Sequence, residues 1–127
     1  MTKPSLMIVD DEKEILSTLK RLLQRDFNLH IFNDPTEALS FYHQNLLPLV
    51  ITDMRMPQMT GAELLEKIHL VNPLAKSILL TGYSEFESSK KSVNEGKVNH
   101  IIEKPWKNQE LKNVIQRLLN EYKADIK

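Results

Sequence analysis

The stretch from Leu49 to Gly61, LVITDMRMPQMTG, joins a run of apolar residues directly to an aspartate. Leu49–Thr52 has the length and composition of a buried β-strand, and Asp53 follows it with no turn residue between. A carboxylate at the end of a buried strand costs free energy unless a neighbouring group favours its charge. The residues that leave the other strands should therefore reveal what that group is.

Short apolar runs and amphipathic stretches alternate along the whole chain. The expected strands are Ser5–Val9, Leu29–Phe32, Leu49–Thr52, Ser77–Leu80 and Val98–Ile102. Five amphipathic stretches lie between and after them and predict five helices. The apolar positions at helical spacing in the first, third and fifth stretches are Ile15, Leu19, Leu22 and Leu23, then Leu64, Leu65 and Ile68, then Leu111, Val114, Ile115, Leu118, Leu119 and Tyr122.

The second and fourth helices are expected from other signals. The second opens with Asp34 as a candidate N-cap, Pro35 at the first helical position and Glu37 in place for a capping box. The fourth, Glu85–Glu95, is weakly apolar and ends before Gly96, a residue that commonly terminates helices.

Strict alternation of strands and helices predicts a parallel sheet with right-handed crossovers. The runs LMIV (6–9), LVIT (49–52) and ILLT (78–81) are continuously apolar, as strands covered on both faces should be. The runs NLHIF (28–32) and VNHII (98–102) contain polar residues, as edge strands do. We therefore expect an α/β fold with a doubly wound five-stranded sheet in the flavodoxin-like order 2-1-3-4-5.

The composition limits the classes of function. A chain of 127 residues is expected to form one domain, and its 17 Lys and Arg residues balance 17 Asp and Glu residues, so no general attraction to nucleic acid follows. It has no cysteine, which excludes disulfides and Cys-type zinc sites. No apolar run approaches the roughly 20 residues of a membrane span, and we expect a cytoplasmic protein.

The residues at the carboxyl ends of the strands carry the strongest signal. They are Asp10, Asp11 and Glu12 after the first strand, Asp53 after the third, Thr81 after the fourth and Lys104-Pro105 after the fifth. In a sheet of this order the site forms beyond these ends, where the strand order changes direction. Carboxylates, a hydroxyl and an amine are therefore expected to meet at one edge.

Such a cluster of acids implies either that some of the acids are protonated or that a cation belongs there. Two carboxylates about 5 Å apart repel by roughly 3 kcal/mol at an effective dielectric constant near 20, and one lysine cannot neutralise them all. Oxygen ligands without His or Cys favour Mg²⁺, with Mn²⁺ as a possible substitute. A divalent ion, a lysine and a hydroxyl beside a carboxylate are suited to phosphoryl transfer, with Asp53 as the nucleophile.

Four motifs, MIVDDE (7–12), ITDMRMPQMTG (51–61), ILLTGY (78–83) and IIEKPW (101–106), together resemble the receiver domain of bacterial two-component response regulators. The resemblance runs from Ser5 to about Tyr122, so we expect a single receiver domain over residues 1–127, with its C-terminal end a candidate for the start of a linker. It fits both a stand-alone regulator and the receiver part of a longer one.

The resemblance implies a role for each site residue. Asp53 would accept the phosphoryl group, and Asp10, Asp11 and the backbone carbonyl of Arg55 would join it in binding Mg²⁺. The phosphoryl oxygens would be bound by Thr81 and Lys104, and Pro105, expected after a cis bond, would shape the Lys104 loop.

This chain departs from the family pattern at two places. Ile101 stands three residues before the lysine, where the family usually has an aromatic switch residue. Arg55 and Tyr83, each two residues beyond a site residue, are large and are expected to tune dephosphorylation.

The implied function is a signalling switch that catalyses only its own phosphorylation and dephosphorylation. Its expected partners are a sensor histidine kinase or a histidine phosphotransfer protein, docking near the first helix and the Pro105-Trp106 loop. The surface of the fourth helix, fifth strand and fifth helix would transmit the signal, with a homodimer on phosphorylation as one outcome. Neither nucleic acid nor a membrane is an expected direct partner.

Three other functions fit the sequence less well. A phosphatase with an aspartate nucleophile would require a second acid two residues after the nucleophile, where this chain has Arg55. A flavin-binding module would want a Ser/Thr/Gly-rich loop after the first strand, where this chain has Asp10-Asp11-Glu12. A receiver that works without phosphorylation would not need Asp11, Asp53, Thr81 and Lys104.

Overall fold

The computed structural model describes residues 2–82, 85, 90, 91, 93, 95 and 98–126. Its strands and helices alternate along these residues. In chain order they are β1 (Ser5–Val9), α1 (Lys13–Leu23), β2 (Asn28–Phe32), α2 (Pro35–Gln44), β3 (Leu49–Asp53), α3 (Gly61–Val71), β4 (Lys76–Thr81), β5 (His100–Glu103) and α5 (Asn108–Asp125).

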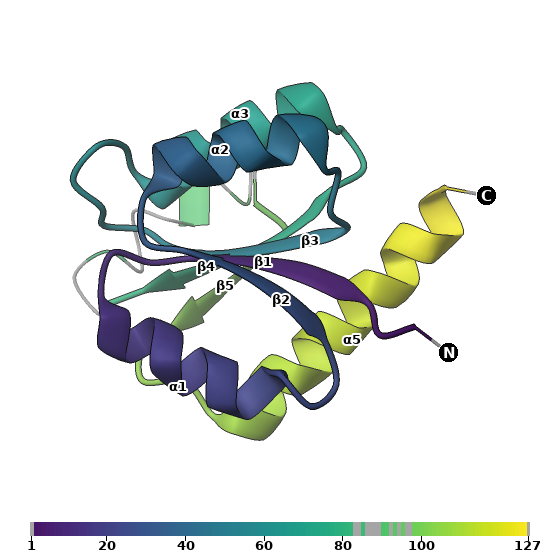
Figure 1. Cartoon of the computed structure of the whole chain (residues 1–127), viewed down its shortest axis with the longest axis horizontal. Helices are drawn as coiled ribbons and strands as arrows, with labels where there is room; N and C mark the ends of the chain where they lie inside the picture. Colours follow the sequence, from purple (N-terminus) through teal and green to yellow (C-terminus); the bar gives the residue numbers. More distant parts are fainter. Residues whose placement is uncertain are drawn as a thin grey trace.

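The strands form one parallel sheet in the order β2-β1-β3-β4-β5, which confirms the predicted topology. Figure 1 shows α1 and α5 against one face of this sheet and α2 and α3 against the other. Along β1, Leu6 and Ile8 enter the core shared with α1 and α5, while Met7 and Val9 enter the core shared with α2 and α3. Burial on both faces explains why this strand is a continuous apolar run.

The predicted strands differ from the observed ones mainly at the edge of the sheet. The fifth strand begins at His100 and not at Val98. The reason lies in Asn99, whose side-chain oxygen accepts the backbone N–H of Ser77 at 2.8 Å and whose own N–H donates to the Ser77 hydroxyl at 3.2 Å. Side-chain bonds at this position replace the backbone ladder, so the strand starts two residues later than predicted.

The described part of the chain contains four helices. The predicted helix over Glu85–Glu95 falls mostly outside the described residues, as does Gly96. Within that segment the N–H of Glu95 donates to the carbonyl of Lys91 at 2.9 Å, a bond of helical spacing. The fold class does not depend on this element.

Two helices have side-chain caps at their N-termini. Asp34 caps α2 as predicted, accepting the N–H of Thr36 at 2.8 Å. The capping box, expected at Glu37, forms in α3, where the Thr60 hydroxyl accepts the N–H of Glu63 and the Glu63 carboxylate accepts the N–H of Thr60. This box fixes the start of α3 immediately beyond β3 and its terminal Asp53.

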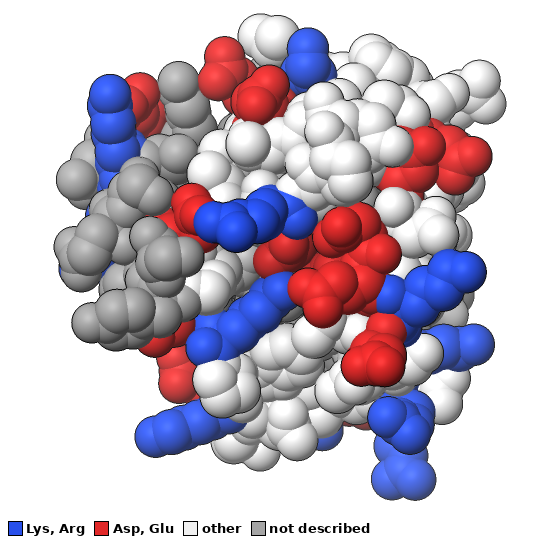
Figure 2. Space-filling model, turned by 90° about the vertical axis from the view of Figure 1, so that its left-hand side faces the viewer, with Lys and Arg blue, Asp and Glu red and all other residues white. Residues whose placement is uncertain are grey.

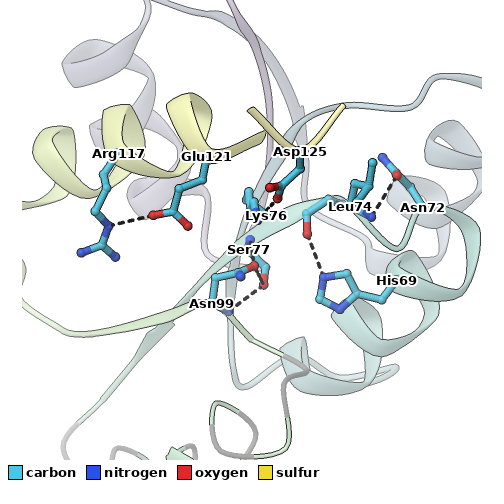
Figure 3. Close-up of polar contacts among 10 residues, drawn as sticks. His69, Asn72, Leu74, Lys76, Ser77, Asn99, Arg117, Glu121 and Asp125 are labelled. Atoms are coloured by element: carbon cyan, nitrogen blue, oxygen red, sulfur yellow. Dashed lines mark hydrogen bonds and ion pairs between the residues drawn. The ribbon is translucent and has the colours of Figure 1, made fainter. Parts of the chain in front are cut away.

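At the amino-terminal edge of the sheet, polar contacts tie α5 to β4 (Figure 3). Lys76, the first residue of β4, pairs with Asp125, the last residue of α5, with Nζ and Oδ2 2.8 Å apart. Ser77 and Asn99 are bonded beside this pair. β4 thus begins with Lys76 at the amino-terminal edge of the sheet and ends with Thr81 at the carboxyl-terminal edge.

Candidate functional site

The predicted site residues meet at the carboxyl-terminal edge of the sheet. Asp10 directly follows β1, Asp53 ends β3, Thr81 ends β4 and Lys104 directly follows β5. Because β1 and β3 are neighbours, the strand order changes direction between them and the site lies at that point. Figure 2 shows acidic side chains clustered at this edge with basic side chains on either side.

Four carboxylates form the centre of the site. One oxygen each from Asp10, Asp11, Glu12 and Asp53 lies within 4.8 Å of the others. Asp10 is 1% exposed and Asp53 5%, whereas Asp11 and Glu12 are exposed. Glu12 is an addition to the predicted ligand set, because the sequence placed it at the strand end without showing that its carboxylate turns back toward Asp53.

The positively charged amine of Lys104 lies beside two of these carboxylates. Its Nζ lies 2.6 Å from Oδ1 of Asp53 and 3.6 Å from Oδ2 of Asp10. Burial acts to lower the pKa of Lys104, but the hydrogen bond to Asp53 and the charges of Asp10 and Asp53 outweigh it, so the pKa is raised. The lysine therefore remains charged and partly neutralises the acids.

Asp10 is the acid whose charge is least compensated. Its Oδ1 accepts the N–H of Glu12 at 2.9 Å, but its Oδ2 is buried and has no hydrogen-bond partner among the residues that the structure describes, since Lys104 Nζ at 3.6 Å is beyond hydrogen-bond range. Desolvation raises the pKa of Asp10 to about 6. An orphaned carboxylate oxygen amid other carboxylates fits a hard divalent cation, which would satisfy it directly or through water.

The loop after β3 holds Asp53 from the other side. The backbone N–H of Arg55 donates to Oδ2 of Asp53 at 3.2 Å. The Arg55 side chain turns outward and forms an ion pair with Glu85. The Arg55 carbonyl belongs to this loop, and its role as a metal ligand stays a prediction.

Gly61 is a positioning residue that the motif analysis quoted without assigning a role. A Cβ at this position would lie 2.2 Å from the backbone oxygen of Asp53 and 2.8 Å from Cδ1 of Leu79. The first turn of α3 therefore packs directly on the end of β3, and the N–H of Gly61 donates to the carbonyl of Met54 at 2.9 Å. A glycine at the start of a helix that follows the acidic strand end is the signal for this contact.

Thr81 is fully buried, and its hydroxyl donates to the carbonyl of Gly82 at 3.1 Å. The backbone N–H of Lys104 donates to the carbonyl of Thr81 at 2.8 Å, which joins the two predicted phosphoryl-binding residues directly. The peptide bond between Lys104 and Pro105 is cis, as expected.

The two departures from the family pattern lie elsewhere. Ile101 is on β5 and is partly buried against the core under α2 and α3. Tyr83 lies outside the described residues.

Two cavities adjoin Lys104. One, of about 440 Å³, is the acidic cleft, lined by Asp11, Glu12, Asp53, Met54, Arg55, Gly82, Glu85 and Lys104. The other, of about 420 Å³, is mainly apolar and lies between α1 and the loop before α5, lined by Ile15, Thr18, Lys104, Pro105, Trp106 and Asn108. The predicted docking residues Pro105 and Trp106 thus line an apolar hollow, and Lys104 borders both this hollow and the acidic cleft.

Fold and site together define a doubly wound α/β domain with an acidic cleft at its switch point. The family model for the response regulator receiver domain matches residues 6–116, and the chain belongs to that family. It is the receiver domain of a two-component response regulator, a class that interacts with sensor kinases. None of the helices in the described ranges has the length and apolarity to cross a membrane.

Solved structures and curated proteins agree with this assignment. A receiver domain protein (CheY-like) from Methanospirillum hungatei is 31% identical, with a TM-score of 0.89 over 98% of this chain and 99% of that one. One from Clostridium thermocellum is 30% identical, with a TM-score of 0.90 over 95% of this chain and 98% of that one. The transcriptional regulatory protein HptR of Staphylococcus aureus is 33% identical over 90% of this chain and 46% of its own length.

The curated relatives are longer than this chain. The chain spans 24% of the hydrogenase transcriptional regulatory protein HoxA of Bradyrhizobium diazoefficiens, at 26% identity over 94% of this chain. The likeness to these regulators therefore covers their receiver part.

Proposed function

We propose that this receiver domain accepts a phosphoryl group on Asp53 from a phosphohistidine of a sensor kinase or a phosphotransfer protein. The observation that carries the proposal is the setting of the Asp53 carboxylate. Lys104 Nζ lies 2.6 Å from one of its oxygens, the N–H of Arg55 lies 3.2 Å from the other, and three more carboxylates surround it in an open cleft.

In this reaction an oxygen of Asp53 attacks phosphorus as the phosphorus–nitrogen bond of the phosphohistidine breaks. Lys104 pairs with the carboxylate before the transfer and then neutralises charge on the transferred oxygens. A Mg²⁺ ion, or Mn²⁺ with the same ligand preference, would be held by Asp10, Asp11, Asp53 and the Arg55 carbonyl. When bound, the ion would neutralise further charge on the phosphoryl oxygens.

Thr81 and Lys104 are suited to convert phosphorylation into a change of surface. Both would turn their side chains toward the phosphoryl group, and the hydrogen bond from the Lys104 N–H to the Thr81 carbonyl couples their strand ends. We infer a shift between two states that alters the surface of β5, α5 and the segment before them. With aliphatic Ile101 in place of an aromatic switch residue, backbone movement after Thr81 carries more of the change.

The partners follow from the same proposal. The apolar hollow between α1 and the Pro105-Trp106 loop would receive the kinase or phosphotransfer protein. HptR and HoxA are transcriptional regulators by name, so control of an output, by contact or by dimerisation of the phosphorylated form, is the corresponding role here. The domain would act as a switch and not as an enzyme on other substrates, with Arg55 and Tyr83 setting the lifetime of its phosphorylated state.

The test is incubation with a small acyl phosphate, with and without Mg²⁺, followed by intact mass measurement. We expect one Mg²⁺-dependent phosphoryl addition in the wild type, none in Asp53→Ala, and an unchanged addition in the control Asp26→Asn, which removes an exposed acid beyond α1. Labelling that persists in Asp53→Ala would show that another residue is the nucleophile.

Two further results would favour the alternatives. Turnover of an independent phosphorylated substrate would support an enzyme. Identical partner binding or dimerisation before and after phosphorylation would support a receiver that works as a passive scaffold.

A further inference from the structure

An ion pair crosses the mouth of the acidic cleft. The guanidinium of Arg55, in the loop after β3, contacts the carboxylate of Glu85, in the segment after β4, and both residues line the cleft. Figure 2 shows a basic side chain next to an acidic one beside the central acids. The pair therefore joins the two chain segments that border the phosphoryl site.

This pair can exchange partners easily. The Arg55 side chain is 76% exposed and the Glu85 side chain 27%, so water competes above all for the guanidinium, and ion pairs with an exposed partner contribute little to stability. Its own backbone N–H is already bonded to Asp53. A phosphoryl group on Asp53 would carry roughly 1.5 to 2 negative charges in place of the single charge of the carboxylate, and it would bring three acceptor oxygens to the site, which makes it a stronger partner than one carboxylate.

Glu85 is also tied to Thr81. The carbonyl oxygen of Gly82 accepts two hydrogen bonds, from the Thr81 hydroxyl at 3.1 Å and from the Glu85 N–H at 3.1 Å. If the hydroxyl leaves this carbonyl to bind a phosphoryl oxygen, the turn that places Glu85 loses one of its supports. Phosphorylation of Asp53 would therefore attract Arg55 toward the site and also weaken the hydrogen bonding that positions Glu85.

We propose that Arg55 exchanges Glu85 for the phosphoryl group on Asp53, and that Glu85 is a positioning residue that holds Arg55 away from the site in the unphosphorylated state. The inference rests on the proposed function of Asp53 and adds a competition between a carboxylate and the phosphoryl group for one guanidinium. It predicts that removing Glu85 strengthens phosphoryl binding through Arg55 and through no other residue.

The test uses beryllofluoride with Mg²⁺ as the phosphoryl probe, with affinity measured by calorimetry and by the fluorescence of Trp106, the only tryptophan of the chain. We expect Glu85→Gln to bind about two- to fivefold more tightly than the wild type, a change of the size associated with exposed charge pairs. Arg55→Gln should bind more weakly, and the double variant should equal Arg55→Gln alone. The control Glu37→Gln removes the same charge from α2 and should leave the affinity unchanged.

Two results would overturn the inference while the proposed function stands. One is wild-type affinity in Glu85→Gln. The other is an equal gain from Glu85→Gln in the Arg55→Gln background, because Glu85 would then act by its charge alone. Failure of the wild type to bind the probe at all would instead refute the proposed function. Both side chains are at the surface, and circular dichroism of each variant checks that the fold is intact.

Discussion

Gly61 shows how one residue positions the reacting carboxylate without contacting it. The backbone of α3 lies so close to the end of β3 that a methyl group would overlap the carbonyl oxygen of Asp53, 2.2 Å away. Backbone atoms cannot move aside as a flexible side chain can, so the start of α3 or the end of β3 would have to shift. The position of Asp53 thus depends on a glycine eight residues further along the chain.

Gly61→Ala should therefore destabilise the protein by about 1–3 kcal/mol, the usual cost of overpacking, and should lower the rate of phosphoryl addition to Asp53. Gly82→Ala is the matched control for stability, because a Cβ there would meet no atom of the described residues within 4 Å. Urea unfolding of both variants checks the first effect, and equal stabilities would contradict the close approach described above.

Asp10 makes the stability of the metal-free protein depend on pH. Its pKa is raised by burial from 3.8 to about 6, so between these values the folded state holds a proton that the unfolded state has released. The folded state is therefore favoured at low pH, and this contribution is lost as the pH rises through about 6. The shift of about two units corresponds to roughly 3 kcal/mol as an upper value.

Asp10→Asn should remove this dependence. We expect the variant to exceed the wild type by about 1–3 kcal/mol in unfolding free energy at pH 7 without Mg²⁺, and to match it near pH 4. Urea titrations from pH 4 to 8 in the presence of a chelator measure the difference. Parallel pH profiles for the two proteins would show that Asp10 does not titrate in this range.

At the scale of the element, the capping box of α3 determines where the helix begins. The Thr60 hydroxyl accepts the N–H of Glu63 at 3.1 Å, and Gly61, the first helical residue, packs on Asp53. A helix without this cap would fray at the end that supports the site, because its first N–H groups would lose their partners.

Thr60→Ala should cost about 1 kcal/mol of stability, the typical value for an N-cap, whereas Thr60→Ser keeps the hydroxyl and should cost much less. Thermal unfolding of the two variants gives the comparison. A loss of the same size in both would mean that the Thr60 methyl group, and not its hydroxyl, supports the helix.

At the scale of the whole molecule, the two edges of the sheet have different tasks. The carboxyl-terminal edge holds the acids and Lys104, whereas the amino-terminal edge is closed by polar contacts such as the Lys76–Asp125 pair (Figure 3). The Lys76 side chain is only 13% exposed, and the last buried residue of α5 is Leu119, one and a half turns before Asp125. The ion pair therefore secures the end of the helix beyond its apolar contacts.

Lys76→Met should speed amide hydrogen exchange in the last turn of α5 while changing global stability by less than about 1 kcal/mol. Glu121→Gln, which removes a pair within α5, is the control and should leave that turn protected. Mass-spectrometric hydrogen exchange measures both, and unchanged protection in Lys76→Met would show that the Lys76–Asp125 pair does not secure the helix end.

The order of the strands and the residues that leave them follow from the pattern of apolar and polar residues along the chain. Residues buried on both faces must be apolar in succession, so the central strands were distinguishable from the edges, and parallel strands necessarily bring Asp10, Asp53, Thr81 and Lys104 to one side. Local signals also identified the Asp34 cap, because a cap depends on neighbours in the chain.

Which atoms meet across that edge becomes known only once the chain has folded. Four contacts join residues from different segments of the chain. They are the 2.6 Å contact of Lys104 with Asp53, the Arg55–Glu85 pair, the packing of Gly61 on Asp53 and the Lys76–Asp125 pair. The start of β5 depends likewise on Asn99 bonding to Ser77. Pattern and propensity describe each element alone, whereas these contacts are set by how the elements pack, and that is a property of the assembled chain.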